Sequence, residues 1–471
     1  MKTVVIVGGG VTGLSAAYYL ERELSEAQEQ LQIVVVEAKE KLGGKIHTIH
    51  ESGFIMEAGA DSIVTRKQNT VPLLEELGLA DEVVHNATGK SYIYTEGQLK
   101  LIPEEAVFGI PIGLESLAKS ELVSAEGKVE ALRDIYTPNE SFTAEDSVGA
   151  FLEAFLGEEL VRKQIAPVLS GVYSGSLKDL TLASTMPYLL DYKNEYGSIM
   201  LGLEANRHIF KGNGNKKFFS FHGGLGCLVD RFEEKLKLKN VEIMKGVPVN
   251  GIQKTSDDSP SYQVQLGDGA VLSADYIVLS TPHQAAMSML NNKDLNEDFS
   301  RLRGSSMLSV YLGFDLDDDA LPVDGTGFIV SGSEDVRCNA CTWTSRKWPH
   351  TSAEGKLLTR LFYKSTSPGF EELANMTEGQ LLDLALTDVA RSLGIQAKPV
   401  SCVIYKWLDA MPNYHLQHPE LVRSLEGRMK QVYPGVLLAG CSYYGVGIPD
   451  CIANGEAAAK RIAQDIKGAK S

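Results

Sequence analysis

The sequence predicts a mixed α/β (α+β multidomain) protein in which one domain is assembled from segments far apart along the chain. Three features indicate this organisation. An apolar run, a glycine cluster and a helical pattern open the chain within its first 25 residues. Residues 114–190 are mostly helical in period, whereas residues 300–410 are rich in strand-like runs. A length of 471 residues suits two or three domains.

The start of the chain has the pattern of a strand, a tight turn and a helix. Residues 4–7 are apolar, and the turn that follows carries Gly8, Gly10 and Gly13 in the G-x-G-x-x-G spacing. Gly8 permits the tight turn, Gly10 lets the backbone approach a pyrophosphate, and Gly13 allows the helix to pack closely on the strand. Unpaired N–H groups at the helix start then face the phosphate charge.

A second apolar run, residues 33–36, ends at Glu37, whose carboxylate can accept hydrogen bonds from ribose hydroxyls. This order of strand, turn, helix, strand and acid predicts a Rossmann-like dinucleotide site. Further on, Gly44 allows a close backbone approach and Lys45 supplies a cation. A surface glycine turn with a solvated lysine is the alternative interpretation of that segment.

The composition is that of an ordinary globular protein, with 44% apolar and 23% charged residues. A net charge of −16 disfavours nucleic acid and anionic lipid as partners. No apolar run reaches the roughly 18 residues of a membrane span. Six scattered cysteines favour a reducing compartment, and the Cys338–Cys341 pair has no second ligand pair for zinc. We expect a cytoplasmic protein without a metal.

Several later segments have the same kinds of pattern. A Gly-Gly segment precedes a helix near residue 228, and strands follow up to the A-D-x-hydrophobic run that ends at Pro282. Strands are predicted at residues 310–314, 327–331, 340–344 and 357–363, with a helix at 377–393. A buried-type strand at residues 435–440 precedes a glycine-rich turn and a last helix that starts near Pro449.

The segments 37–45, 218–282 and 445–452 resemble those of the amine-oxidase-like flavoprotein superfamily. The resemblance implies that FAD binds here, with a backbone contact near Val247 to the adenine. It also implies that the last helix points at the flavin ring. A plain docking helix is the alternative for that last element.

Four further segments make the resemblance more specific: residues 57–62, 170–175, 341–350 and 445–452. They resemble the bacterial protoporphyrinogen/coproporphyrinogen oxidase family, in its soluble Gram-positive branch, over essentially the whole chain. One departure is visible, because the family usually has proline where this chain has Ala60. The turn and the resemblance together predict these cofactor-binding residues: Gly8, Gly9, Gly10, Val11, Thr12, Gly13, Glu37, Ala38, Gly44, Lys45, Gly59, Ala60, Asp61, Ser62, Val247, Trp407, Val446, Gly447 and Ile448.

The resemblance implies a tetrapyrrole substrate, which needs a large apolar slot with cations at its rim. It places a substrate-contacting base at Lys67. Lys211, Lys216 and Lys217 form a second basic cluster, for which a solvated surface is the favoured interpretation. The predicted substrate-binding residues are Lys67, Arg66, Gly171, Val172, Tyr173, Tyr311, Phe328 and Val330, although at strand spacing the apolar ones could equally be core.

The activity implied by the resemblance is the six-electron aromatisation of a porphyrinogen to its porphyrin in haem biosynthesis. FAD would take hydride equivalents, and molecular oxygen would reoxidise it with release of hydrogen peroxide. No side-chain acid or base is identified, because the cofactor carries the chemistry. Coproporphyrinogen III is favoured over protoporphyrinogen IX; an amine oxidase, a polyene desaturase and a redox-inert FAD protein are the alternatives. Haem-pathway enzymes are the protein partners that the resemblance suggests.

The predicted domains follow the same resemblance. An FAD-binding domain comprises residues 1–66, 218–288 and 432–471. A strand-rich substrate domain comprises residues 67–95, 200–217 and 289–431. A helical domain comprises residues 96–199.

Overall fold

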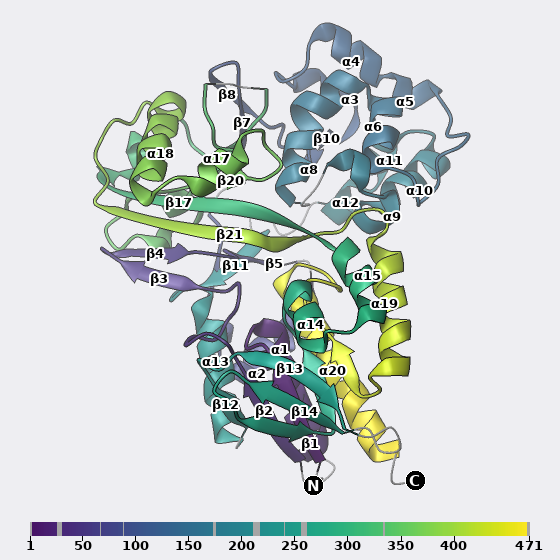
Figure 1. Cartoon of the computed structure of the whole chain (residues 1–471). Helices are drawn as coiled ribbons and strands as arrows, with labels where there is room; N and C mark the ends of the chain where they lie inside the picture. Colours follow the sequence, from purple (N-terminus) through teal and green to yellow (C-terminus); the bar gives the residue numbers. More distant parts are fainter. Residues whose placement is uncertain are drawn as a thin grey trace.

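The computed structural model describes residues 2–25, 31–65, 67–87, 89–172, 176–210, 217–239, 241–255, 261–332 and 335–468. These residues form three parts, shown in Figure 1. The lower part, which contains both ends of the chain, holds a parallel sheet. The upper left part holds a large, mainly antiparallel sheet, and the upper right part consists of helices.

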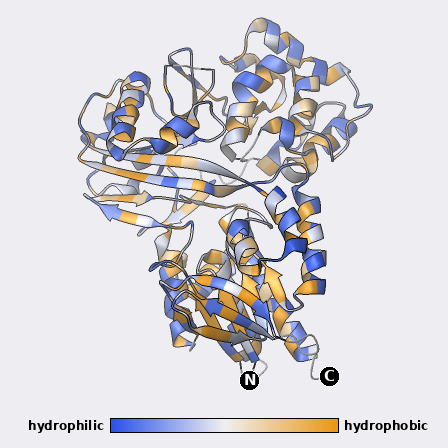
Figure 2. Ribbon diagram, in the orientation of Figure 1, coloured by the Kyte–Doolittle hydropathy of each residue, from blue (hydrophilic) through white to orange (hydrophobic). Residues whose placement is uncertain are grey.

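The parallel sheet of the lower part is buried on both faces, so its strands are continuous apolar runs (Figure 2). Val4 and Ile6 face a core formed with helices α1 (Val11–Ser25), α13 (Gly226–Leu238) and α20 (Ile448–Gly468). In spatial order the strands are β12 (Glu242–Met244), β2 (Leu31–Val36), β1 (Lys2–Val7), β16 (Tyr276–Leu279) and β22 (Val436–Leu438).

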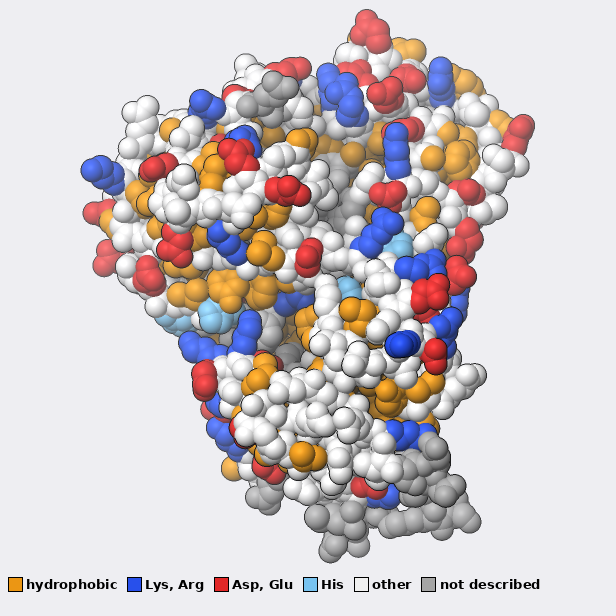
Figure 3. Space-filling view, in the orientation of Figure 1, with side chains coloured by type: hydrophobic (Ala, Val, Ile, Leu, Met, Phe, Trp, Pro, Cys, Tyr) orange, Lys and Arg blue, Asp and Glu red, His pale blue; other side chains and the backbone are white. Residues whose placement is uncertain are grey.

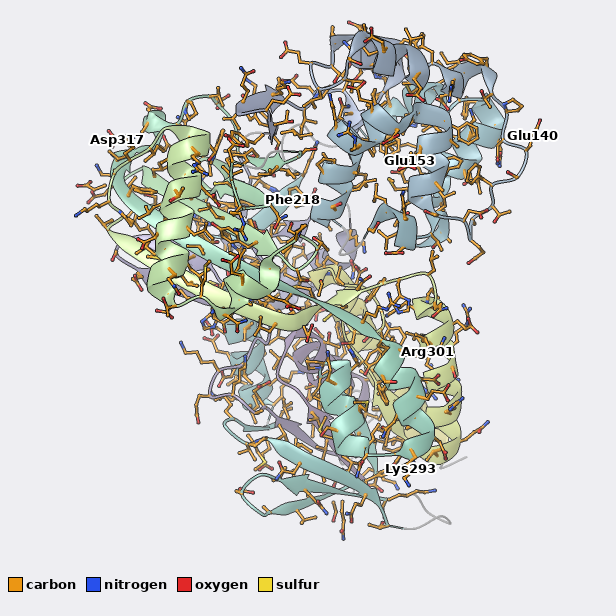
Figure 4. All side chains as sticks on the ribbon, turned by 45° about the horizontal axis from the view of Figure 1, so that its top comes forward. Glu140, Glu153, Phe218, Lys293, Arg301 and Asp317 are labelled. Carbon is orange, nitrogen blue, oxygen red and sulfur yellow. The ribbon has the colours of Figure 1, made fainter. Side chains whose placement is uncertain are left out.

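Val5 and Val7 face the opposite side of the parallel sheet, where a second core lies. A three-stranded sheet and three helices cover that side. They are β13 (Val249–Lys254), β14 (Tyr262–Leu266), β15 (Val271–Ala274), α14 (His283–Leu290), α15 (Lys293–Arg301) and α19 (His418–Val432). Lys293 and Arg301 mark the two ends of α15 in Figure 4.

The large sheet of the upper left part has seven strands. Its strands, in spatial order, are β21 (Ser401–Asn413), β17 (Arg303–Asp317), β20 (Lys356–Lys364), β19 (Ala340–Trp343), β18 (Gly327–Val330), β7 (Tyr92–Thr95) and β8 (Gln98–Leu101). Helix α18 (Glu378–Leu393) covers one face, and Leu308 and Leu361 pack beneath it. Ile93 on β7 belongs to the core of the helical part, so the opposite face meets that part at this end.

Shorter elements connect the three parts. They are β3 (Thr48–Glu51), β4 (Phe54–Glu57), β5 (Ile63–Val64), α2 (Val71–Leu77), β6 (Val83–His85), β11 (Phe218–Phe221), α16 (Thr344–Lys347) and α17 (Phe370–Asn375). Strand β11 pairs with both β5 and β6. Phe218, its first residue, lies centrally in Figure 4, where the three parts meet.

The helical part has an apolar core of its own and a surface on which charged side chains are interspersed with apolar ones (Figure 3). Its elements are β9 (Ala106–Val107), β10 (Ile110–Pro111), α3 (Gly113–Lys119), α4 (Ala125–Ala131), α5 (Arg133–Tyr136), α6 (Val148–Leu156), α7 (Glu158–Leu160), α8 (Ala166–Val172), α9 (Leu182–Thr185), α10 (Pro187–Tyr196), α11 (Ile199–Ala205) and α12 (Arg207–Phe210). Among the described helices of the chain, none is long and apolar enough to cross a bilayer.

A buried ion pair ties three of these helices together. Lys193 and Asp134 have no exposed side-chain surface, and their charged atoms lie 3.1 Å apart. The Asp134 carboxylate also accepts hydrogen bonds from the backbone N–H groups of Ile199 and Met200 at 2.9 Å. Helix α11 therefore packs with the helical part, although the predicted boundary at residue 200 assigned it elsewhere; the domain limits stay predictions.

Candidate active site

The glycine turn between β1 and α1 forms the first wall of the candidate site. Gly8 has a φ of +107°, a left-handed conformation that favours glycine. A Cβ atom on Gly13 would lie 2.0 Å from the carbonyl oxygen of Gly8, so only glycine lets the helix come this close to the strand.

A second glycine segment lies across from this turn. The N–H of Gly43 donates to the carbonyl oxygen of Gly9 at 2.8 Å. Gly10 and Gly44 face each other, and a Cβ on Gly10 would meet only the Gly44 Cα within 4 Å, at 3.9 Å. A Cβ on Gly44 would lie 3.3 Å from the Gly10 Cα, so the two backbones lie almost in contact. Together they present bare backbone, without side chains, on which the pyrophosphate of a dinucleotide can lie.

Glu37 is held at the end of β2, next to the turn. Its carboxylate accepts hydrogen bonds from the N–H of Gly9 at 2.7 Å and from the N–H of Lys39 at 2.9 Å. Its backbone carbonyl accepts from the N–H of Val247 at 3.0 Å, and Ala38 is exposed beside it. The carboxylate is therefore fixed in place, with lone pairs left for ribose hydroxyls.

Residues 57–62, which begin with the last residue of strand β4 and continue into the loop after it, form the opposite wall. A Cβ on Gly59 would lie 1.9 Å from the carbonyl oxygen of Lys45, so glycine is required at this crossing. The N–H of Ala60 donates to that same oxygen at 3.0 Å. From the large sheet, Trp407 Nε1 donates to the carbonyl oxygen of Ala58 at 2.8 Å. The loop is thus attached to both the dinucleotide part and the large sheet.

A buried arginine lies directly behind this loop. Arg360, on β20, is 2% exposed, and its Nη2 donates to the carbonyl oxygens of Ala58 and Gly59 at 3.2 and 3.0 Å. Its Nε donates to the hydroxyl of Ser309 at 2.8 Å. The guanidinium lies over the rings of Tyr311 and Phe362. The sequence interpretation did not include Arg360, because a single arginine inside an apolar strand carries no motif.

Two carboxyl groups on the loop titrate differently. Asp61 pairs with Lys347 at 3.0 Å and accepts from the hydroxyl of Ser62 at 2.8 Å. Burial opposes its ionisation, but the charges of Lys347 and Arg360 outweigh burial and lower the pKa of Asp61 to about 2. Burial raises the pKa of Glu57 to about 7. The loop therefore carries one fixed negative charge and one carboxyl that titrates near neutrality.

The start of α20 closes the third side. Val446 is 56% exposed on the preceding turn, while Ile448 is buried. A Cβ on Gly455 would lie 2.4 Å from the carbonyl oxygen of Thr12, so α20 packs tightly against α1. Because of this packing, the N-terminus of α20, which Gly447 precedes, is fixed relative to the glycine turn at the start of α1.

Two lysines reach this side of the site. Lys67 forms an ion pair with Asp450 in the first turn of α20. Lys45 Nζ lies 3.2 Å from the thiol sulfur of Cys441. A hydrogen bond from Cys451, together with the nearby charge of Lys45, lowers the pKa of the Cys441 thiol. This thiol was not singled out from the sequence, since an isolated cysteine gives no signal.

The large sheet presents only one of its faces to the site. Paired residues on neighbouring strands share a face, and Phe328 pairs with Tyr92 and Cys341, which pack beneath α18. Val330 lies on that same face and packs against the same core. The structure therefore does not bring Phe328 and Val330 to the site, which corrects their predicted role as substrate walls. Ile329, between them, faces the site side.

Tyr311 lies on the site face but beneath the loop. Its side chain is buried, and its hydroxyl accepts a hydrogen bond from the N–H of Glu57 at 3.1 Å. Burial raises the pKa of Tyr311 to about 12. Tyr311 therefore supports the loop, and the half-buried side chains of Met307, Phe362 and Ile329 are the apolar surface of this face.

Some predicted residues lie outside what the structure describes. Arg66, Tyr173, Lys211 and Lys216 are among them. Gly171 and Val172 end helix α8, but only their backbone is described. Among the described residues, no cluster of histidine, cysteine and acidic side chains could hold a metal ion.

The bare backbone of the two glycine segments, the fixed Glu37 carboxylate and the loop at residues 57–62 fit FAD in an extended conformation. The turn and Glu37 would hold its nucleotide end, and residues 58–62 with the start of α20 would hold its ring end. Bound there, FAD would supply a hydride acceptor. The chain's own residues would orient the cofactor and exclude water from an apolar surface.

The whole chain matches known proteins. Residues 11–463 match the family described as flavin containing amine oxidoreductase. A coproporphyrinogen III oxidase of Bacillus subtilis is 35% identical over 97% of both chains, and one of Staphylococcus aureus is 30% identical over 99% of this chain and all of the other. A crystal structure of a candidate protoporphyrinogen oxidase from Exiguobacterium sp. 255-15 superposes with a TM-score of 0.88, at 33% identity, over 98% of this chain and 99% of that one.

More distant structures show the same fold. A putrescine oxidase superposes over all of both chains with a TM-score of 0.68 at 14% identity. This likeness is one of fold. The chain belongs to the family of flavin-containing amine oxidoreductases and is an FAD-dependent oxidoreductase.

Proposed function

We propose that this enzyme oxidises coproporphyrinogen III to coproporphyrin III. The observation that carries the proposal is end-to-end similarity to two enzymes named coproporphyrinogen III oxidase, at 35% and 30% identity. The geometry agrees with a large apolar substrate, because Met307 and Phe362 are half-buried apolar side chains on the same face of the sheet as Arg360, which holds the loop at residues 57–62.

The reaction removes six hydrogens from the porphyrinogen. Three rounds of two-electron oxidation, each returning its electrons to molecular oxygen, would give one porphyrin and three molecules of hydrogen peroxide. Such hydride transfer needs orientation and a dry surface rather than a nucleophile. Two buried residues, Arg360 and Trp407, hold the carbonyl groups of the loop at residues 57–62 and so fix the loop that would orient the flavin. The reaction needs no side chain that attacks the substrate.

The positions of the two tyrosines near the last motif argue against amine oxidation. An aromatic cage for an amine would require their rings to face the flavin, and neither ring does so. Tyr443 is buried in the core on the far side of the parallel sheet, and the Tyr444 hydroxyl donates to Glu426 at 2.5 Å. The turn that does reach the site carries the aliphatic Val446.

An anaerobic titration tests the proposal. The purified yellow protein is mixed with coproporphyrinogen III, protoporphyrinogen IX or putrescine, and the flavin absorbance is followed before air is admitted. We expect the fastest bleaching with coproporphyrinogen III, then porphyrin fluorescence and peroxide once oxygen enters. Faster bleaching with protoporphyrinogen IX would reverse the substrate assignment, and bleaching only with putrescine would replace it with amine oxidation.

We also propose, from the sequence, a cytoplasmic location and haem-pathway enzymes as partners. The absence of long apolar runs and the scattered cysteines support the location. Fractionation of cells followed by activity assay tests it, and recovery of the activity in the membrane pellet would contradict it.

A further inference from the structure

Lys364, the last residue of β20, is a half-buried cation on the site face of the large sheet. Met307 pairs with Lys364 on one side and with Trp407 on the other, so the three side chains form a row on one face. Strands lie about 4.8 Å apart, so the row brings Lys364 within roughly 10 Å of Trp407, backbone to backbone. Trp407 donates a hydrogen bond to the loop, at the carbonyl oxygen of Ala58.

The only partner of this ammonium among the described residues is neutral. Lys364 Nζ donates to the carbonyl oxygen of Ser170, in the last turn of α8, at 2.8 Å. No carboxylate within the described parts of the chain lies within ion-pair distance of it. Burial lowers the pKa of Lys364, and no neighbouring charge offsets the effect. A buried ammonium without a counter-charge is costly unless an anion joins it.

Two other lysines near the site do have a carboxylate partner. Lys67 is paired with Asp450, and Lys347 is paired with Asp61. An anionic ligand that enters between the large sheet and α8 would therefore meet Lys364 as an uncompensated charge. Its carboxylate could replace Ser170 or share the ammonium with it, since an ammonium has three donors.

We propose that Lys364 binds a carboxylate of the substrate and so fixes the macrocycle against the side chains of Met307 and Trp407, which lie in the same row of the sheet. This inference rests on the proposed function, because the carboxylate is a propionate of the porphyrinogen. Lys67, which pairs with Asp450 in the first turn of α20, lies on a different wall. A propionate that binds Lys67 has to displace the Asp450 carboxylate, whereas one that binds Lys364 displaces only a neutral carbonyl group.

A purely structural role for Lys364 would be to cap the carboxyl end of α8. The chain offers a matched control for that role in Lys406. Lys406 lies on β21 and donates to the carbonyl oxygens of Ala374 and Met376, at the end of α17. Lys406 pairs with Leu308, whose side chain packs under α18, so it lies on the opposite face of the same sheet.

Three variants of the FAD-loaded enzyme test the proposal: Lys364→Met, Lys364→Arg and Lys406→Met. For Lys364→Met we expect the KM for coproporphyrinogen III to rise by about 10-fold or more, with kcat within about 2-fold, because a charge-assisted hydrogen bond is lost. Lys364→Arg should restore most of the affinity. Lys406→Met should lower the melting temperature without changing KM.

A binding measurement separates affinity from turnover. Quenching of coproporphyrin III fluorescence by each variant gives Kd for the product, which has the same four propionates; Lys364→Met should weaken it by a similar factor. An unchanged KM and Kd in a folded, yellow Lys364→Met would overturn the proposal, as would equal KM changes in Lys364→Met and Lys406→Met. If the wild-type enzyme itself fails to oxidise either porphyrinogen, the proposed function fails instead.

Discussion

Arg360 and Gly59 are joined by a hydrogen bond of 3.0 Å between side chain and carbonyl oxygen, although 301 positions separate them in the sequence. The bond couples the large sheet to the loop that follows β4. Gly59 also packs so closely on the backbone of Lys45 that a Cβ atom would lie 1.9 Å from the Lys45 carbonyl oxygen. Lys45 belongs to the segment that follows the parallel-sheet strand β2. One short loop thereby takes its position from two parts of the molecule, and a flavin ring placed beside it would be positioned by both.

Replacement of Arg360 tests this coupling. Arg360→Met keeps the bulk but leaves the carbonyl group of Gly59 and the hydroxyl of Ser309 without the donor they have now, while the carbonyl group of Ala58 keeps only its bond from Trp407. We expect a loss of at least about 2 kcal/mol in unfolding free energy, and a lower ratio of FAD to protein after gel filtration. Arg337→Met is the control, since the Arg337 side chain forms a surface ion pair with Glu372 among the residues that the structure describes, and its loss should cost less than about 0.5 kcal/mol. Equal losses in the two variants would contradict the role of Arg360.

Substitution of Gly10 tests the predicted pyrophosphate site. A Cβ on Gly10 would meet only the Gly44 Cα within 4 Å, so the branched side chain of Gly10→Val would cover the bare backbone on which a pyrophosphate would lie. We expect a folded but colourless protein that does not regain FAD, as measured by the visible absorbance of the flavin in a reconstitution assay. Gly427→Ala, on the exposed surface of α19, should retain FAD fully. A yellow, fully loaded Gly10→Val would exclude this glycine segment as the pyrophosphate site.

Lys67 and Asp450 form a pair of tests with opposite signs. Lys67→Ala removes the cation that pairs with Asp450 in the first turn of α20, so we expect a higher KM for the porphyrinogen with unchanged FAD content. Asp450→Asn keeps the shape of the side chain but releases the charge of Lys67 from its ion pair, so KM should fall. Steady-state kinetics with both variants measure this, and an unchanged KM in Lys67→Ala would remove Lys67 from the substrate site.

Glu57 makes stability depend on pH. Its pKa is about 7 in the folded protein and about 4.3 in an unfolded chain, so the folded state binds more protons between these values. The contribution of Glu57 to the free energy of unfolding is therefore fully present below about pH 4.3, and it is lost as the pH rises through about 7. Glu57→Gln keeps an acceptor for the N–H of Leu225 and removes the titration. Urea unfolding from pH 5 to 8 should show a flatter profile in the variant; parallel profiles would refute the assignment.

The dinucleotide frame could be predicted from sequence because its signals are local. The turn from Gly8 to Gly13 requires particular glycines within a few residues, and the strands beside it are continuous apolar runs. Strand β18 and helix α18 were likewise placed to within a residue or two, at 327–330 and 378–393. Periodicity alone carries that information.

The sequence by itself thus determined the elements, the glycine turn and the acid at Glu37, because each depends on neighbours along the chain. Only the tertiary structure decided which side of the large sheet meets the cofactor. Both faces of that sheet are covered, so neighbouring residues such as Phe328 and Ile329 are both apolar. The alternation of apolar and polar residues that would show which side chain faces the site is therefore absent from the sequence. For the same reason Arg360 and Lys364 gave no signal in the sequence: what makes them matter is the loop and the helix that pack across the sheet from them.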